Sequence, residues 1–199
     1  MLLDSSWDVW SLAWDLVPRA HRYFELHAHW RYHRGIAEDA EEHWRFLMGM
    51  EVPVYMRRTE HDIPQSVAYP FKEIADSIGR PNGWCHEDHP YCESSIAFML
   101  ALAIHEAITF NDISRIGGWG VDMGTDTEYW YQRPNMEYLI GLAKGLGIPV
   151  FVPPQSSLLT PAMGKPYGEW KAEEEWQPPA DWPAHLRHDD LTRNEEVAA

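Results

Sequence analysis

The sequence SSIAFMLALAIHEAITFNDISRIGGWGVDMGTDTEYWYQRPNMEYLIGLAKGLGIPVFV spans residues 94–152 and decides the fold. A helix between two strands is typical of the βαβ unit, which builds parallel sheets with binding sites at the carboxyl ends of the strands. The polar loop of this stretch would lie at such an end. The pattern predicts a buried helix over 95–108, a glycine-bearing strand over 113–123, a polar loop over 124–133, a second helix over 134–146 and a closing strand over 149–152.

The chain before this stretch supplies three more strands. Two of them, over residues 7–14 (WDVWSLAW) and 22–27 (RYFELH), are short and rich in aromatic residues. The third covers residues 52–56 (VPVYM), where Pro53 indicates an edge position or the first residues of the strand. The expected architecture is therefore an α/β fold with a mainly parallel sheet of about five strands flanked by helices.

Helices and loops complete the pattern. Apolar residues with a spacing of four, four and three predict an amphipathic helix over residues 36–48. Residues 57–93 contain several prolines and predict mostly loop, with one short helix over 71–78. We expect one α/β domain over residues 1–160 and an extended, partly disordered tail rich in Pro, Trp and acidic residues over 161–199.

The charge of the chain argues against several partners. The 199 residues include 31 acidic and 16 basic ones, and the formal net charge is -15. Such a charge repels phosphate backbones and anionic lipid surfaces, so we expect no general binding of nucleic acid or membrane. No apolar run approaches the roughly 18 residues that span a bilayer, and the N-terminus lacks a signal-like pattern. We expect a soluble, intracellular protein, and homo-oligomerisation stays open.

A cysteine and histidine cluster occupies residues 85–92 (CHEDHPYC). The thiols of Cys85 and Cys92 and the imidazoles of His86 and His89 are ligand types that zinc prefers, although their spacing matches no standard zinc finger or knuckle. Two interpretations stay open, a structural zinc site and a metal-free loop. Two cysteines are too few for a disulfide framework.

Polar residues at two predicted element ends are candidates for ligand binding. Ser94 and Ser95 precede the apolar helix, where one of them caps its N-terminus or faces the phosphate or carboxylate of a ligand. Asp122 ends the predicted strand, where a carboxylate binds a ribose hydroxyl, a metal or an amine, or else caps a turn. We assign Asp122 to the candidate catalytic residues.

The polar loop supplies the predicted anion contact. Pro134 suits the first position of a helix and disfavours helical geometry for Arg133, which would therefore remain on the loop as an anion clamp. A solvent-exposed surface position is the alternative for this arginine. The other candidate ligand-binding residues of this region are Glu128, Gln132 and Asn135.

A second candidate catalytic group ends the second predicted strand. Glu25 and His27 form an acid and imidazole pair that could transfer protons, while a structural hydrogen bond is the alternative. The common signatures of serine hydrolases, P-loop proteins and zinc proteases do not occur in the sequence.

Five segments together carry a family resemblance: WDVWSLAW, RYFELH, SSIAFMLALAI, ISRIGGWGVDM and EYWYQRPNMEYLIGLAKGLGIPVFVP. They resemble a group of Rossmann-like proteins of tailed phages and prophages, distantly similar to the 6-hydroxymethylpterin diphosphokinase MptE-like domain and to sialyltransferase-type glycosyltransferases. The resemblance implies a three-layer Rossmann-like fold with a nucleotide or nucleotide sugar at the carboxyl edge of the sheet. The first glycine-rich βα unit of such folds is missing, because the first glycine is Gly35.

Two functions follow as expectations. The first is a phage-type, nucleotide-dependent transferase, glycosyl- or diphosphotransferase-like, in the cytoplasm of an infected or lysogenic host cell. The second is a non-enzymatic phage protein that sequesters a nucleotide signal or contacts a host protein. The candidate cofactors are magnesium and zinc, and the residues identify neither. Fold analogy does not choose between these chemistries.

Overall fold

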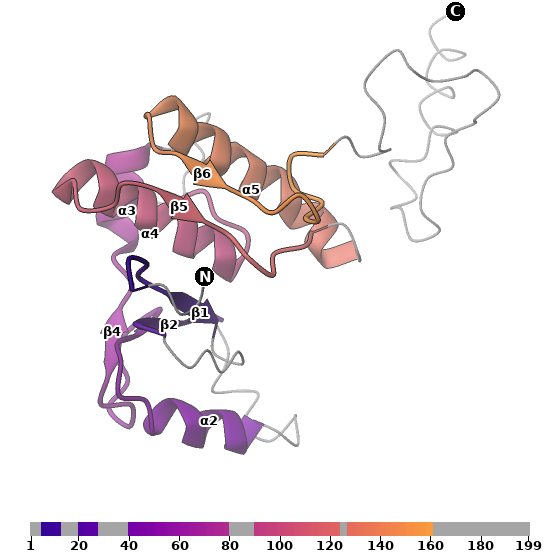
Figure 1. The fold of residues 1–199 in the computed structure, drawn as a ribbon. Helices are drawn as coiled ribbons and strands as arrows, with labels where there is room; N and C mark the ends of the chain where they lie inside the picture. The colour runs from indigo at the N-terminus through magenta and orange to yellow at the C-terminus, as the bar shows by residue number, and fades with distance from the viewer. Residues whose placement is uncertain (1–4, 13–19, 28–39, 80–89, 124–126, 161–199) are drawn as a thin grey trace, which may run out of the picture.

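The protein is a mixed α/β fold with a parallel sheet, as the sequence predicts (Figure 1). The computed structural model describes residues 5–12, 20–27, 40–79, 90–123 and 127–160. The predicted tail over 161–199 lies outside these residues. The described elements are β1 (Trp10–Leu12), β2 (Arg22–Glu25), α2 (Ala40–Met48), β3 (Val54–Met56), β4 (Ser66–Ala68), α3 (Phe71–Ile78), α4 (Ser95–Phe110), β5 (Ile116–Gly117), α5 (Thr127–Gly145) and β6 (Val150–Phe151).

The described strands form two parallel sheets instead of the single sheet that we expected. The first sheet has the order β1-β2-β3-β4, and the second pairs β5 with β6. In the first sheet Glu25 is the register partner of Met56, which in turn pairs with Ala68. Pro53 immediately precedes β3, an internal strand, so an edge position is wrong and the proline lies just before the first residue of the strand. Its carbonyl accepts a hydrogen bond from Tyr23 N.

Helices cover both faces of the four-stranded sheet (Figure 1). On one face Trp44 and Leu47 of α2 pack against Tyr23 and Val54. On the other face Phe24 packs in a cluster with residues of α3 and α4. The described strands follow one another in chain order, without the reversal of strand order that marks the ligand site of a Rossmann sheet. A Rossmann-like classification therefore stays a prediction.

Helix α4 is buried on two sides. Ala101 and Leu102 belong to the cluster that covers the four-stranded sheet. Leu100 and Ile104 belong to a second cluster, which includes residues of α5. Such an all-round apolar helix is typical of the centre of a fold. Within the described residues no helix is long and apolar enough to cross a membrane.

Helix α5 is longer than predicted. It starts at Thr127 and continues through Pro134, so most of the predicted polar loop is helical. Proline usually ends or kinks a helix because it lacks an N–H. Here the residues on both sides of Pro134 are buried and hydrogen-bonded, and these contacts override the local preference. The expected loop position of Arg133 is wrong.

Strands β4 and β5 also differ from expectation. The sequence predicts a loop over residues 66–68, but these residues pair with β3 as a short edge strand. The strand expected over 113–123 shrinks to Ile116–Gly117. A Cβ atom at Gly117 would lie 2.1 Å from the Trp119 ring, and Gly120 has a φ of +73°. The glycines therefore let Trp119 fold back over the strand, which ends the regular pairing.

The double burial of α4 predicts an asymmetric response to truncation. Ile104→Ala should lower the free energy of unfolding by about 2–5 kcal/mol, because it leaves a cavity in the core. Ile108→Ala, one turn further on the same helix, should change it by less than about 0.5 kcal/mol, since Ile108 is 41% exposed. Urea unfolding of both variants measures the difference. Equal losses would contradict the burial described for α4.

Candidate functional site

Glu25 is the centre of a buried polar cluster at the carboxyl end of β2. Its Oε1 atom lies 2.6 Å from Nδ1 of His27 and 3.1 Å from the backbone nitrogen of that residue. The other carboxylate oxygen lies 2.8 Å from Nε2 of His43, on α2. The Glu25 side chain is 3% exposed and that of His27 is 71% exposed. The predicted pair is therefore present, with a second imidazole added.

The protonation of this cluster follows from its contacts. Burial acts to raise the pKa of Glu25, but the hydrogen bonds from His27 and His43 and the charge of His27 outweigh it, and the pKa falls from 4.5 to about 2. An ionised carboxylate only accepts hydrogen bonds, so Nδ1 of His27 and Nε2 of His43 both carry protons. In its neutral form His27 then has its lone pair at Nε2. This is the arrangement of a histidine oriented for proton transfer.

Two arginines follow β3 at the same edge of the sheet. Arg57 comes directly after Met56, the register partner of Glu25. Its guanidinium carbon lies 5.3 Å from the centre of the Phe71 ring. The Nε atom of Arg58 donates to Glu60 Oε1 at 3.0 Å. The Arg57 side chain thus lies toward α3, whereas Glu25 faces His43 of α2 on the other side of the sheet. Guanidinium groups bind anions, and an acid with an imidazole can move a proton.

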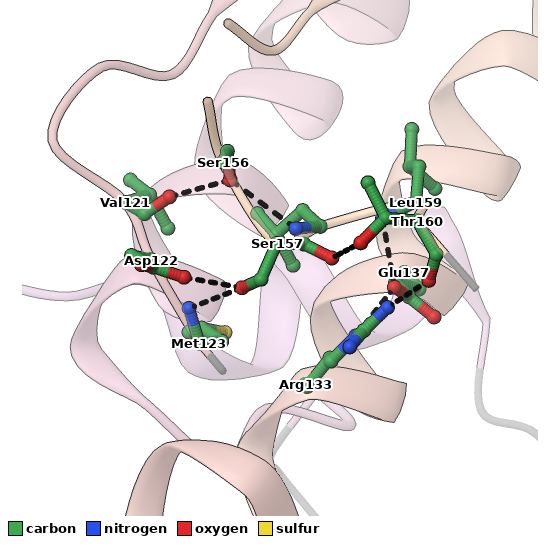
Figure 2. A network of polar contacts seen from close by, with 10 residues as sticks. Val121, Asp122, Met123, Arg133, Glu137, Ser156, Ser157, Leu159 and Thr160 are labelled. Carbon is green, nitrogen blue, oxygen red and sulfur yellow. Dashed lines mark hydrogen bonds and ion pairs between the residues drawn. The ribbon is translucent and has the colours of Figure 1, made fainter. Parts of the chain in front are cut away.

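The predicted site at the end of β5 is a second network, shown in Figure 2. The Ser157 hydroxyl donates to Asp122 and accepts from Met123 N at 2.9 Å. The Ser156 hydroxyl donates to the Val121 carbonyl at 2.6 Å. These bonds fasten the segment after β6 to the segment after β5. The exposed Asp122 carboxylate thus takes part in a structural contact, and its catalytic role stays a prediction.

Arg133 belongs to the same network (Figure 2). Its Nε donates to Glu137 Oε1 at 2.8 Å, and its Nη2 donates to the Thr160 carbonyl. Leu159 N also donates to Glu137, at 2.8 Å. Arg133 is 8% exposed. A buried guanidinium with these partners joins α5 to residues 156–160, and its predicted binding of a ligand anion is untested.

The other predicted ligand-binding residues have mostly structural places. Ser94 is the N-cap of α4 and accepts from Ala97 N at 3.1 Å, as one of the two expectations for this position requires. Ser95 is the first residue of that helix. Asn135 is fully buried, accepts from Glu93 N at 3.0 Å and donates to the Tyr91 carbonyl at 2.8 Å. Glu128 and Gln132 lie in α5, outside any loop.

The predicted zinc cluster falls mostly outside the described residues, since these exclude Cys85, His86 and His89. Cys92 is partly buried among apolar side chains of two clusters. Burial raises the pKa of its thiol above the usual value, which favours the protonated form. The described part of the chain contains no group of three potential metal ligands.

Three features of these polar clusters escaped the sequence interpretation. His43 was assigned only to a helix, and 18 residues separate it from Glu25. The one available signal was that a buried carboxylate such as that of Glu25 needs hydrogen-bond donors, which a histidine can supply. Arg57 and Arg58 are predicted as loop residues, which is correct, but the missed pairing of β3 with β4 hides their place at the end of a sheet strand. Ser156 and Ser157 follow Pro153 in a stretch without periodicity, which carries no signal for the network.

Comparison of the chain with protein-family models, curated proteins and solved structures gave no match. The fold and the two polar clusters therefore define a mixed α/β protein with a parallel sheet, and the phage resemblance stays a prediction.

Glu25 should make the stability depend on pH. The pKa of Glu25 is lower in the folded than in the unfolded protein, so ionised Glu25 adds about 3 kcal/mol to the free energy of unfolding. This contribution is fully present above pH 4.5 and is lost as the pH falls toward 2. Glu25→Gln should flatten this loss in urea unfolding between pH 6 and pH 3. Glu41→Gln is the control, since Glu41 is exposed on α2. Parallel pH profiles for wild type and Glu25→Gln would contradict the assignment.

The contacts of Arg133 predict a structural role. Arg133→Ala should lower the free energy of unfolding by about 1.5–3 kcal/mol, as expected for a buried, charge-assisted hydrogen bond. Arg45→Ala should change it by less than about 0.5 kcal/mol, because the Arg45–Glu41 pair is exposed. An anion clamp would instead give unchanged stability and nucleotide binding weakened by roughly ten- to a hundredfold. Calorimetry and denaturation on the same samples separate the two roles.

Proposed function

We propose that the protein is a nucleotide- or nucleotide-sugar-binding transferase of the phage type, with its ligand at the carboxyl edge of the β1–β4 sheet. The observation that carries the proposal is the contact between buried, ionised Glu25 and exposed His27. Parallel sheets bind ligands at this edge, so the pair lies where a substrate would be expected. The nucleotide class is supported by the family resemblance of the sequence.

His27 is the proposed general base. In a transfer from a nucleotide sugar, the acceptor hydroxyl attacks the sugar carbon, the bond to the diphosphate breaks, and Nε2 of His27 takes the hydroxyl proton. Glu25 holds the ring through Nδ1 and stabilises the imidazolium that results. His43 binds the second oxygen of Glu25 and so fixes the carboxylate. A positioned base of this kind contributes about 10²- to 10⁴-fold to the rate.

Ligand binding is the first test. Thermal-shift measurements against nucleoside diphosphates, nucleotide sugars and triphosphates, with and without magnesium, should show stabilisation by at least one class. A ligand at 100 times its Kd adds about 2.7 kcal/mol of stability. If none of these compounds raises the melting temperature at millimolar concentration, the proposal is wrong.

The proposed base gives the second test. His27→Gln should reduce transfer to acceptor or to water by about 10²-fold or more while leaving nucleotide affinity unchanged. Release of nucleoside diphosphate from a bound nucleotide sugar measures the transfer. His61→Gln is the matched control, because His61 is fully exposed and contacts Asp62. Full activity in the His27→Gln variant would contradict the proposed role of His27 as the general base.

A non-enzymatic binding protein is the second candidate, favoured by an aromatic surface near β5 and β6. Trp119 is 40% exposed and Phe151 is 51% exposed, and their ring centres lie 5.5 Å apart. Trp7 packs edge-on against Trp119 at 5.4 Å. Aromatic side chains are enriched in contact surfaces. Bound nucleotide recovered chemically unchanged after long incubation would favour this candidate over the transferase.

A further inference from the structure

Arg57 and Arg58 follow β3, the strand that pairs with the strand of Glu25. Met56 and Glu25 are register partners on neighbouring strands, and Arg57 is the next residue of the chain. Given the spacing of strands and residues in a sheet, the Cα atoms of Arg57 and Glu25 are about 6 Å apart. The Arg57 side chain leaves toward α3 and that of Glu25 toward α2, so a ligand that contacts both must lie across the end of the sheet.

The connection that carries both arginines is firmly held. Glu60 N donates to the Ser66 hydroxyl at 2.9 Å, and this hydroxyl donates back to the Glu60 carbonyl at 3.1 Å. Ile63 is 1% exposed and packs in the cluster between the sheet and α2. The connection between β3 and β4 is thus held at its middle by Ile63 and at its end by Ser66. An anion site on such a connection loses little entropy on binding.

The two side chains are held in different ways. The Arg57 guanidinium lies against the Phe71 ring, which itself contacts the rings of Tyr69 and Phe98 at 4.7 and 5.6 Å. A guanidinium stacked on a ring keeps its N–H groups directed sideways, where they can bind an anion in a bidentate way. Arg58 is 73% exposed and is anchored by the buried carboxylate of Glu60.

The charge balance distinguishes Arg57 from most other described basic residues. Within the described ranges Arg22, Arg45, Lys72 and Arg133 each pair with a carboxylate. Arg57 takes part in no ion pair in the same part of the chain, and its recorded contact is the one with Phe71. In a protein with a net charge of -15, an uncompensated arginine beside the sheet edge is a local attraction for anions.

We propose that Arg57, supported by Arg58, binds the diphosphate group of the nucleotide ligand. This inference rests on the proposed function and names the residues that recognise its substrate. A diphosphate offers enough anionic oxygens for both guanidinium groups, whereas a nucleoside offers no anionic oxygen. The arginines therefore select ligands by their phosphates, and His27 acts on the group attached to them.

The test compares phosphate-dependent binding among four variants. Isothermal titration calorimetry uses the four ribonucleoside diphosphates and inorganic pyrophosphate as probes. Arg57→Gln should weaken binding of the best diphosphate and of pyrophosphate by roughly ten- to a hundredfold. Arg57→Lys should fall between wild type and Arg57→Gln, because lysine keeps the charge but not the bidentate geometry. Arg58→Gln should show a smaller loss.

Arg45→Gln is the matched control and should bind as the wild type does, because Arg45 lies on the exposed surface of α2. Unchanged urea midpoints in all variants confirm that the fold is intact. Wild-type affinity in both Arg57→Gln and Arg58→Gln would overturn this inference while leaving the proposed function standing. Absence of binding of every diphosphate and of pyrophosphate by the wild type would also overturn this inference. The proposed function fails only if the nucleotide sugars and triphosphates of the thermal-shift test fail as well.

Discussion

The burial of α4 on two sides is the constraint on which the rest of the structure depends. One side of the helix covers the four-stranded sheet, and another packs with α5, β5 and β6. Several of its buried residues are alanines, which let both neighbours approach closely. A partly buried ion pair ties this helix to the sheet, since Arg22 on β2 donates to Glu106 on α4 at 2.6 Å. Helix α4 thus packs against both sheets and joins them.

Much of the fold could be predicted because its elements have strong local signals. The span of α3 was predicted over the residues that it occupies, and α4 extends two residues beyond its predicted end. The failures have physical reasons. Residues 66–68 carry no alternation of buried and exposed positions, so their pairing with β3 depends on a tertiary partner. Helix α5 crosses Pro134 because burial of Arg133 and Asn135 outweighs the local cost of proline.

The candidate site could be predicted where its residues are neighbours in the chain. Glu25 and His27 are two residues apart, and their contact follows from the position of a strand end. His43 contacts Glu25 from α2, and no local sequence pattern predicts such a contact. Among the polar residues predicted to form the ligand site, Arg133 and Asn135 donate to backbone carbonyls of other segments, and Asp122 accepts from Ser157. Clustering of polar residues in a sequence indicates satisfied backbone as readily as it indicates a ligand.

The position of α4 in the chain has a consequence for synthesis on the ribosome. Strands β1 to β4 are complete by Ala68, whereas α4, which covers one of their faces together with α3, begins at Ser95. The apolar side chains of that face, including Phe24 and Leu26, emerge well before their cover. Nascent chains of this intermediate length therefore expose an apolar surface, to which ribosome-associated chaperones bind. The delay lasts for the translation of the connecting segment, and rapid elongation through it would favour productive folding.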